Sequence, residues 1–169
     1  MTGPLIVPAE VWYHGAGHGA GPRPIVIENA AGDMLGVVNH VPKHSPAGMG
    51  WGYAGSGPAD CARSLLIAVL GDDARCEVCG GAGQIVYPID DERPVTQPFQ
   101  AGKPVDEYFA GRPVEVSSCW ADKCDEGCTV MPSVYQAFKF QFVATWGPEW
   151  RISRAEILAW LATQPEWPR

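Results

Sequence analysis

Apolar and polar residues alternate in several short stretches of this chain, and apolar residues recur at helical spacing in a few longer ones. Alternation over about five residues predicts a β-strand, because successive side chains of a strand point to opposite faces. Val11 and Tyr13 would lie on one face of such a strand and Trp12 on the other, and two further short runs rich in Ile, Leu and Val are strand-like, so the N-terminal part is predicted to form three short strands. They cover residues 10–14, 25–28 and 34–38.

Helical spacing predicts three helices in the rest of the chain. The first covers residues 61–70, where Asp60 favours the positive end of the helix and Gly71 stops it. The second covers residues 134–143, although the alternation of three phenylalanines leaves a strand as the alternative. A brief extended stretch at 150–152 precedes the third helix, which starts with a capping box formed by Ser153 and Glu156. The pattern indicates an α+β fold, a small N-terminal sheet packed with about three helices.

An insert of different character separates the first helix from the second. Two strand-like segments, 84–89 and 113–117, lie next to cysteines, and a proline-containing loop joins them. Residues 72–132 hold 12 Asp and Glu against 5 Lys and Arg, so their formal charge of −7 equals that of the whole chain. We therefore predict a discontinuous core domain, residues 1–71 and 133–169, interrupted by an acidic, zinc-stapled subdomain, residues 72–132.

The composition limits the classes of function. A pI of about 5.0 disfavours nucleic acid as the main partner, because phosphate binding needs clustered Lys and Arg. No apolar run reaches the length of about 18 residues that spans a membrane, and the N-terminus shows no signal-peptide pattern. The expected compartment is the cytoplasm, where paired cysteines are more often metal ligands than disulfides.

Five of the six cysteines lie in the insert and carry the clearest chemistry of the sequence. Cys76 and Cys79 have the two-residue spacing of a zinc knuckle, in which one turn directs both sulfurs toward the same ion. We predict one structural zinc ion held by these two, Cys124 and Cys128, with Cys119 as the alternative fourth ligand. A closed set of four thiolates is favoured over an open catalytic site or a redox pair, because it is the usual structural set.

The glycine-rich stretch before the first helix is the second candidate site. Free backbone N–H groups at a helix N-terminus favour an anion, which here would involve Tyr53, Gly55, Ser56 and Gly57. The stretch has no lysine after its last glycine, so it is not a Walker A loop. The alternative is a tight turn anchored by aromatic residues. The sequence indicates no catalytic residues.

Four motifs together resemble a small bacterial and phage domain family of unknown function. They are Tyr13-His14-Gly15, the run W-G-Y-A-G-S-G-P-A-D from Trp51 to Asp60, Tyr135-Gln-Ala-Phe-Lys139, and the run from Trp150 to Leu161 that contains S-x-x-E-I-x-x-W-L. The resemblance covers about residues 10–71 and 133–163, which the cysteine-bearing insert separates. It implies a helix rather than a strand over residues 138–143, and it implies no activity.

Three function hypotheses follow from these observations. The favoured one is a non-enzymatic, zinc-containing binding or regulatory protein that contacts another protein, in the host cytoplasm if the chain is phage-encoded. The concentrated negative charge supports it, because charge steers a protein toward an oppositely charged surface. The second hypothesis is an enzyme that binds an anionic substrate at the turn 51–58. The third is nucleic-acid binding through the zinc element, which the acidic charge weakens.

Overall fold

The computed structural model describes residues 10–17, 23–88 and 114–165. The chain divides into two compact units: a core unit, residues 1–69 and 133–169, and an insert unit, residues 70–132. Among the helices of the described part of the chain, none has the length and apolar character needed to cross a membrane.

The core unit contains a four-stranded antiparallel sheet in the order β3-β2-β1-β6. Its strands are β1 (Trp12–Ala16), β2 (Ile25–Glu28), β3 (Met34–Val37) and β6 (Glu149–Ser153). The first three lie within two residues of the predicted ones. The fourth, which the sequence indicates only as a brief extended stretch, pairs with β1 along its whole length and places Ile152 opposite Tyr13. A strand from the end of the chain therefore completes the N-terminal sheet.

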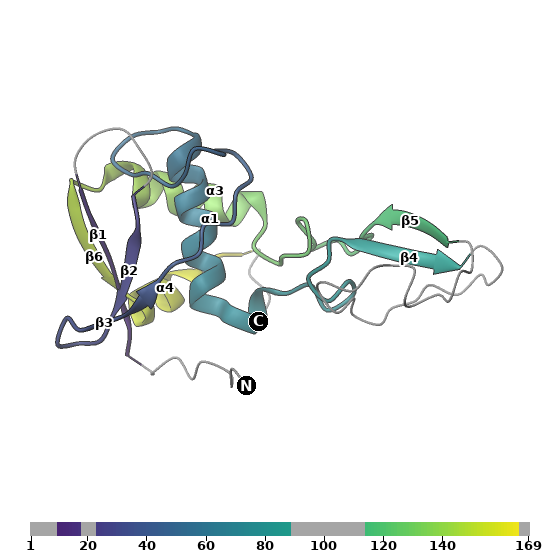
Figure 1. Cartoon of the computed structure of the whole chain (residues 1–169), viewed down its shortest axis with the longest axis horizontal. Coiled ribbons are helices and arrows are strands. Elements are labelled where there is room, and N and C mark those ends of the chain that lie inside the picture. The colour runs from purple at the N-terminus through teal and green to yellow at the C-terminus, as the bar shows by residue number, and fades with distance from the viewer. Residues whose placement is uncertain (1–9, 18–22, 89–113, 166–169) are drawn as a thin grey trace. The chain divides into compact units, whose positions relative to one another are not determined.

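Three helices of this unit lie on one side of the sheet (Figure 1). They are α1 (Ser56–Leu70), α3 (Pro132–Gln141) and α4 (Arg154–Leu161), and the short 3-10 helix η2 (Val143–Thr145) follows α3. Side chains from the sheet and from the helices share one core, in which the following are at most 1% exposed: Tyr13, Ile25, Leu65, Leu66, Phe138 and Ile157. The predicted α+β fold is confirmed, and so is the helix over most of residues 134–143.

The capping box at the start of α4 is confirmed in its hydrogen bonds. The backbone N–H of Glu156 donates to the hydroxyl oxygen of Ser153 at 3.1 Å, and the backbone N–H of Ser153 donates to the Glu156 carboxylate at 2.9 Å. The hydrogen bonds from the Ser153 hydroxyl and from its backbone also lower the pKa of Glu156. Both ends of the motif therefore satisfy N–H groups that the helix itself leaves without partners.

Replacing Ser153 with alanine should lower the free energy of unfolding by about 1 kcal/mol, because one N–H group of the first turn loses its acceptor. Urea denaturation at neutral pH measures this change. Ser153→Thr keeps a hydroxyl and should lose clearly less. Equal losses in both variants would show that packing, and not the cap, determines the effect.

The insert unit is built on a hairpin-like pair of antiparallel strands, β4 (Gln84–Pro88) and β5 (Val114–Ser118). It begins with the 3-10 helix η1 (Gly71–Ala74), where Gly71 has a φ of 58°. This left-handed conformation ends an α-helix, as predicted, and glycine adopts it without a steric penalty. The two strands place Ser118 opposite Gln84, which determines where the next residue, a cysteine, lies.

Candidate metal centre

Four cysteines of the insert unit bring their sulfur atoms together: Cys76, Cys79, Cys119 and Cys124. The four Sγ atoms all lie within 4.8 Å of one another. The Sγ–Sγ distance is 3.8 Å between Cys76 and Cys119 and 3.7 Å between Cys79 and Cys124. All of them are free thiols. The group can therefore hold a metal ion through four sulfur ligands.

Backbone N–H groups from two turns point at this sulfur cluster. The N–H of Gly83 donates to Sγ of Cys79 and that of Gly127 donates to Sγ of Cys124, each at 3.3 Å. Burial raises the pKa of Cys79, but its backbone hydrogen bonds outweigh burial and hold that pKa below its usual value. Burial raises the pKa of Cys119 and of Cys124. Four thiolates at this separation repel one another, so a bound cation is needed to stabilise them together.

The two turns approach each other so closely that glycine is required in both. A Cβ atom on Gly83 would lie 2.9 Å from the backbone carbonyl carbon of Glu126, and Gly127 has a φ of 91°. Buried apolar groups complete the surroundings, since Ile85 is 2% exposed and Val78 packs against the same cluster. A low-dielectric shell of this kind strengthens the attraction between thiolates and a cation.

Cys128, the preferred fourth ligand in the sequence analysis, does not belong to this group, and Cys119 takes its place. Strand pairing is the reason. The N–H of Cys119 donates to the carbonyl of Gly83 at 2.9 Å, which carries its thiol to the turn that follows Cys79. Cys128 instead forms an isolated bridge with Arg75, and its sulfur accepts a hydrogen bond from the backbone N–H two residues later at 3.3 Å. Spacing alone could not separate the two cysteines, because both lie within a few residues of Cys124.

The second candidate site, the glycine-rich turn before α1, surrounds a tyrosine ring. A Cβ atom on Gly57 would lie 2.5 Å from the Tyr53 hydroxyl, and one on Gly55 would lie 2.6 Å from a ring carbon. The glycines therefore make room for Tyr53, which is 51% exposed. Tyr53, Gly55, Ser56 and Gly57 do lie on one turn, but the ring occupies the space beside two of its glycines. Anion binding at this turn stays a prediction.

The first half of α1 contains a buried carboxylate, and the sequence does not predict its burial. Asp60 is 0% exposed. Its oxygens accept hydrogen bonds from the backbone N–H groups of Lys43 at 3.1 Å, His44 at 2.8 Å and Ser45 at 2.9 Å, and Nε2 of His40 lies 3.0 Å away. Burial raises the pKa of Asp60, but the hydrogen bonds, that of His40 first, outweigh it and lower this pKa overall. Asp60 therefore fixes the loop 40–45 to the helix, beyond the favourable dipole interaction expected from the sequence.

His14 lies on β1, within the strand that the sequence predicts over residues 10–14. Its Nδ1 is 2.8 Å from the Glu28 carboxylate, and its Nε2 is 3.2 Å from that of Glu149. The hydrogen bond with Glu28 is the main reason why the pKa of His14 is raised. Arg151 also donates to Glu28 at 3.2 Å, and these four residues border an open hollow of about 450 Å³. The Arg151 guanidinium therefore lies beside one of the two carboxylates, and the His14 ring lies between both.

The comparisons with known proteins agree with the family resemblance in its N-terminal part. Residues 13–79 match the model of a family of unknown function (DUF6166), a range that includes the turn before α1, the buried Asp60 and the first cysteine pair. The remaining motifs, from Tyr135 onward, lie outside the matched range. The chain matches no curated protein and no solved structure. The segment from Tyr13 to Cys79 is thus similar to the DUF6166 family, whose function is unknown.

Proposed function

We propose that Cys76, Cys79, Cys119 and Cys124 hold one structural zinc ion. The geometry of the four sulfurs carries this proposal. A regular tetrahedron with Zn–S bonds of about 2.3 Å has sulfurs about 3.8 Å apart. The distances of 3.8 Å and 3.7 Å between opposite pairs of cysteines agree with that value.

Zinc at this site would stabilise structure. Tetrahedral sets of four thiolates favour zinc or iron–sulfur chemistry, and four protein ligands leave no open position for substrate or water. The ligands come from two segments, 76–79 and 119–124, that the sequence separates by 39 residues. The insert unit has a small buried cluster around Ile85, so a metal ion joining these segments supplies stability that its apolar core alone does not.

We propose further that the chain is a binding or regulatory module that contacts another protein through the insert unit. The support is electrostatic. The described part of this unit, residues 70–88 and 114–132, holds seven acidic and two basic residues. Four thiolates around a divalent ion add a charge of about −2. Such a surface attracts basic proteins and repels phosphate backbones, which disfavours the nucleic-acid hypothesis.

The enzyme hypothesis has less support. It requires the turn 51–58 to receive an anionic substrate, and there the Tyr53 ring lies against the glycines that would give access to backbone N–H groups. The four sulfurs, for their part, form a closed set.

Removing the insert should leave the core unit folded but without its partner. We expect a variant in which a short Gly/Ser linker joins Gly71 to Ser133 to stay soluble and to unfold cooperatively, because the sheet and its helices lie in the core unit. Circular dichroism during thermal unfolding tests the fold. To test the function, the full chain and the shortened chain are each used to capture proteins from a cell lysate. Mass spectrometry then compares the captured proteins. An aggregated product would contradict the expectation that the core unit folds by itself. A partner retained by the shortened chain would contradict the expectation that the insert unit binds it.

A further inference from the structure

One large aromatic side chain of the insert unit is exposed directly beside a proposed zinc ligand. Trp120 follows Cys119 in the chain and is 60% exposed. Tryptophan is costly to leave in water, and it is also the residue most enriched at energetic hot spots of protein interfaces. Trp120 is therefore a candidate anchor for a protein partner.

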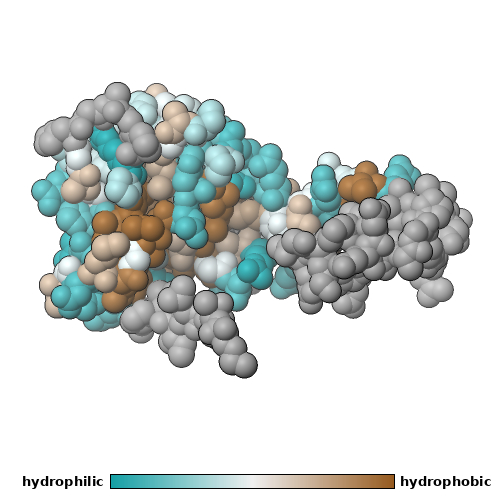
Figure 2. All heavy atoms as spheres, in the orientation of Figure 1, coloured by the Kyte–Doolittle hydropathy of each residue, from teal (hydrophilic) through white to brown (hydrophobic). Residues whose placement is uncertain are grey.

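The strand pattern places a second apolar side chain on the same face. From Val116 to Trp120 exposure alternates: Val116, Ser118 and Trp120 are exposed, whereas Ser117 and Cys119 are partly buried. The hydrogen bond from the N–H of Cys119 to Gly83 continues the ladder one residue beyond β5. Trp120 and Val116, which is 47% exposed, therefore lie on the face that points away from the sulfur cluster. Figure 2 shows an apolar spot, in brown, among hydrophilic neighbours on this unit.

The loop that carries Trp120 has a cysteine of the metal centre at each of its ends. Cys119 and Cys124 both contribute sulfurs to the cluster, and the N–H of Cys124 donates to the carbonyl of Ala121 at 3.1 Å. A bound metal would hold this short loop in one conformation. Pre-ordering lowers the entropy cost of binding, so Trp120 is presented as a rigid anchor.

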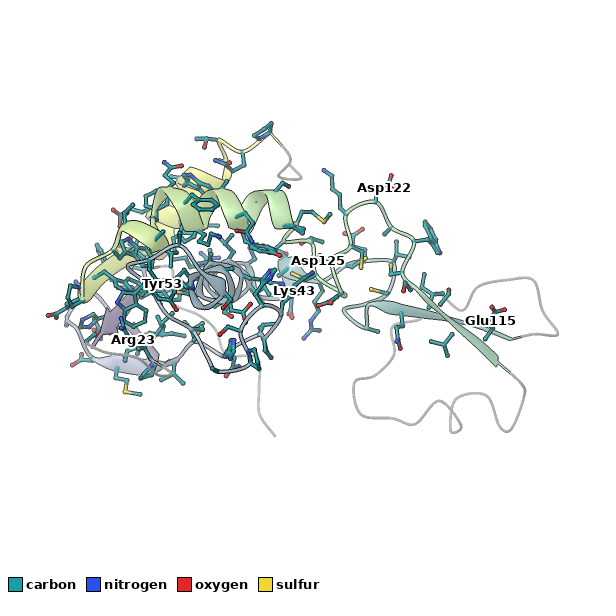
Figure 3. The ribbon with its side chains drawn as sticks, turned by 90° about the horizontal axis from the view of Figure 1, so that it is seen from above. Arg23, Lys43, Tyr53, Glu115, Asp122 and Asp125 are labelled. Carbon is teal, nitrogen blue, oxygen red and sulfur yellow. The ribbon has the colours of Figure 1, made fainter. Side chains whose placement is uncertain are left out.

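The anchor belongs to an acidic unit, and the nearest carboxylate along the chain follows it by two residues. Figure 3 shows Asp122 on this loop and Glu115 on β5, both at the surface; Glu115 lies on the strand face opposite to Val116. Carboxylates attract lysine and arginine, and the face of an indole ring attracts the same cations. Lys123 is the one basic residue of this loop, and it adds a single opposing charge.

We propose that Trp120, supported by Val116, is the apolar centre of a docking surface for an arginine- or lysine-bearing segment of another protein. A guanidinium or ammonium group stacks on the indole, and carboxylates of the acidic insert unit, Asp122 among them, pair with further basic side chains. This docking surface rests on the proposed function, because it belongs to the insert unit of a binding module. It adds that the partner is basic and that Trp120 is the central contact.

Fluorescence anisotropy with the full, zinc-loaded chain tests the proposal. The probes are three labelled dodecapeptides of equal leucine content, rich in arginine, in lysine or in glutamate, and a labelled single-stranded DNA of 20 nucleotides. At physiological salt we expect binding of a basic peptide only. Trp120→Ala should weaken it by about tenfold or more, as truncation of a hot-spot residue does, and Trp120→Phe should have a smaller effect.

Phe140→Ala is the matched control, because Phe140 of the core unit is equally exposed, at 60%. This variant should bind the basic peptide as the unmodified chain does. Equal affinity in Trp120→Ala, equal loss in Phe140→Ala, absence of basic-peptide binding, or preference for DNA or the acidic peptide would each overturn the proposal. The zinc content of every variant is measured as well, so that failure of the metal proposal can be told from failure of the docking surface. A chain without zinc refutes the metal proposal. A zinc-loaded chain whose affinity for the basic peptide does not change in Trp120→Ala refutes only the docking surface.

Discussion

Cys119→Ser should remove most of the bound zinc, whereas Cys128→Ser should leave it in place. The thiol of Cys119 lies 3.8 Å from that of Cys76 in the four-sulfur cluster, and Cys128 does not belong to the cluster. Structural zinc contributes on the order of 10 kcal/mol to the folding of small zinc-binding peptides. Loss of one of four thiolates should therefore unfold the insert unit before the core unit.

Metal analysis after gel filtration in the presence of a mild chelator measures the first effect. The expected content is about one zinc per chain for the unmodified protein and for Cys128→Ser, and well below that for Cys119→Ser. Limited proteolysis measures the second effect, because cleavage should concentrate within residues 70–132 when the metal is lost. If Cys128→Ser loses zinc and Cys119→Ser retains it, the ligand set is wrong. If the unmodified protein carries iron, the choice of metal is wrong and the set of ligands stands.

Asp60→Ala should destabilise the core unit by about 3 kcal/mol or more, because each buried polar group left without a hydrogen-bond partner costs about 1–3 kcal/mol. The substitution leaves the backbone N–H groups of Lys43, His44 and Ser45 without their acceptor inside the protein. Asp60→Asn keeps one acceptor oxygen and should lose less. Asp72→Asn serves as the control, because Asp72 forms an ion pair with Arg75 whose two side chains are 90% and 68% exposed. Exposed pairs of this kind contribute little, so its free energy of unfolding should scarcely change.

The same carboxylate predicts a dependence of stability on pH. The pKa of Asp60 is lower in the folded protein than its ordinary value of 3.8. Its contribution is therefore fully present above about pH 4, and it is lost as the pH falls through the lowered folded pKa. Urea denaturation between pH 7 and pH 2 should show the difference between the unmodified protein and Asp60→Asn shrinking over the acidic end of this range. A difference that is constant down to pH 2 would show that the charge of Asp60 is not what stabilises the loop.

Several features of this protein follow from short-range effects, and the sequence alone predicts them. A short run of β-branched apolar residues locates β2 at Ile25–Glu28, and Ser153 with Glu156 marks the start of α4. The two-residue spacing of Cys76 and Cys79 predicts a pair of sulfurs directed to one point, which the structure shows. Each of these features depends on neighbours within about one turn of chain, so the residues involved and their spacing contain the whole cause.

Other features depend on which distant segments pair, and only the tertiary structure decides them. β6 joins the sheet beside β1, a contact between the two ends of the sequence that alternation within either strand cannot reveal. Cys119 rather than Cys128 enters the sulfur cluster because the register of β4 and β5 places it beside Gly83. Asp60 becomes a buried acceptor because the loop 40–45 folds back over α1. In the first two cases the deciding interactions are backbone hydrogen bonds between residues far apart in the chain, and any segment's N–H and C=O groups can make such bonds, whatever its side chains. In the third case the acceptor is a carboxylate, but its donors are backbone N–H groups, which every residue of a loop except proline carries, so the sequence does not show which loop will donate them.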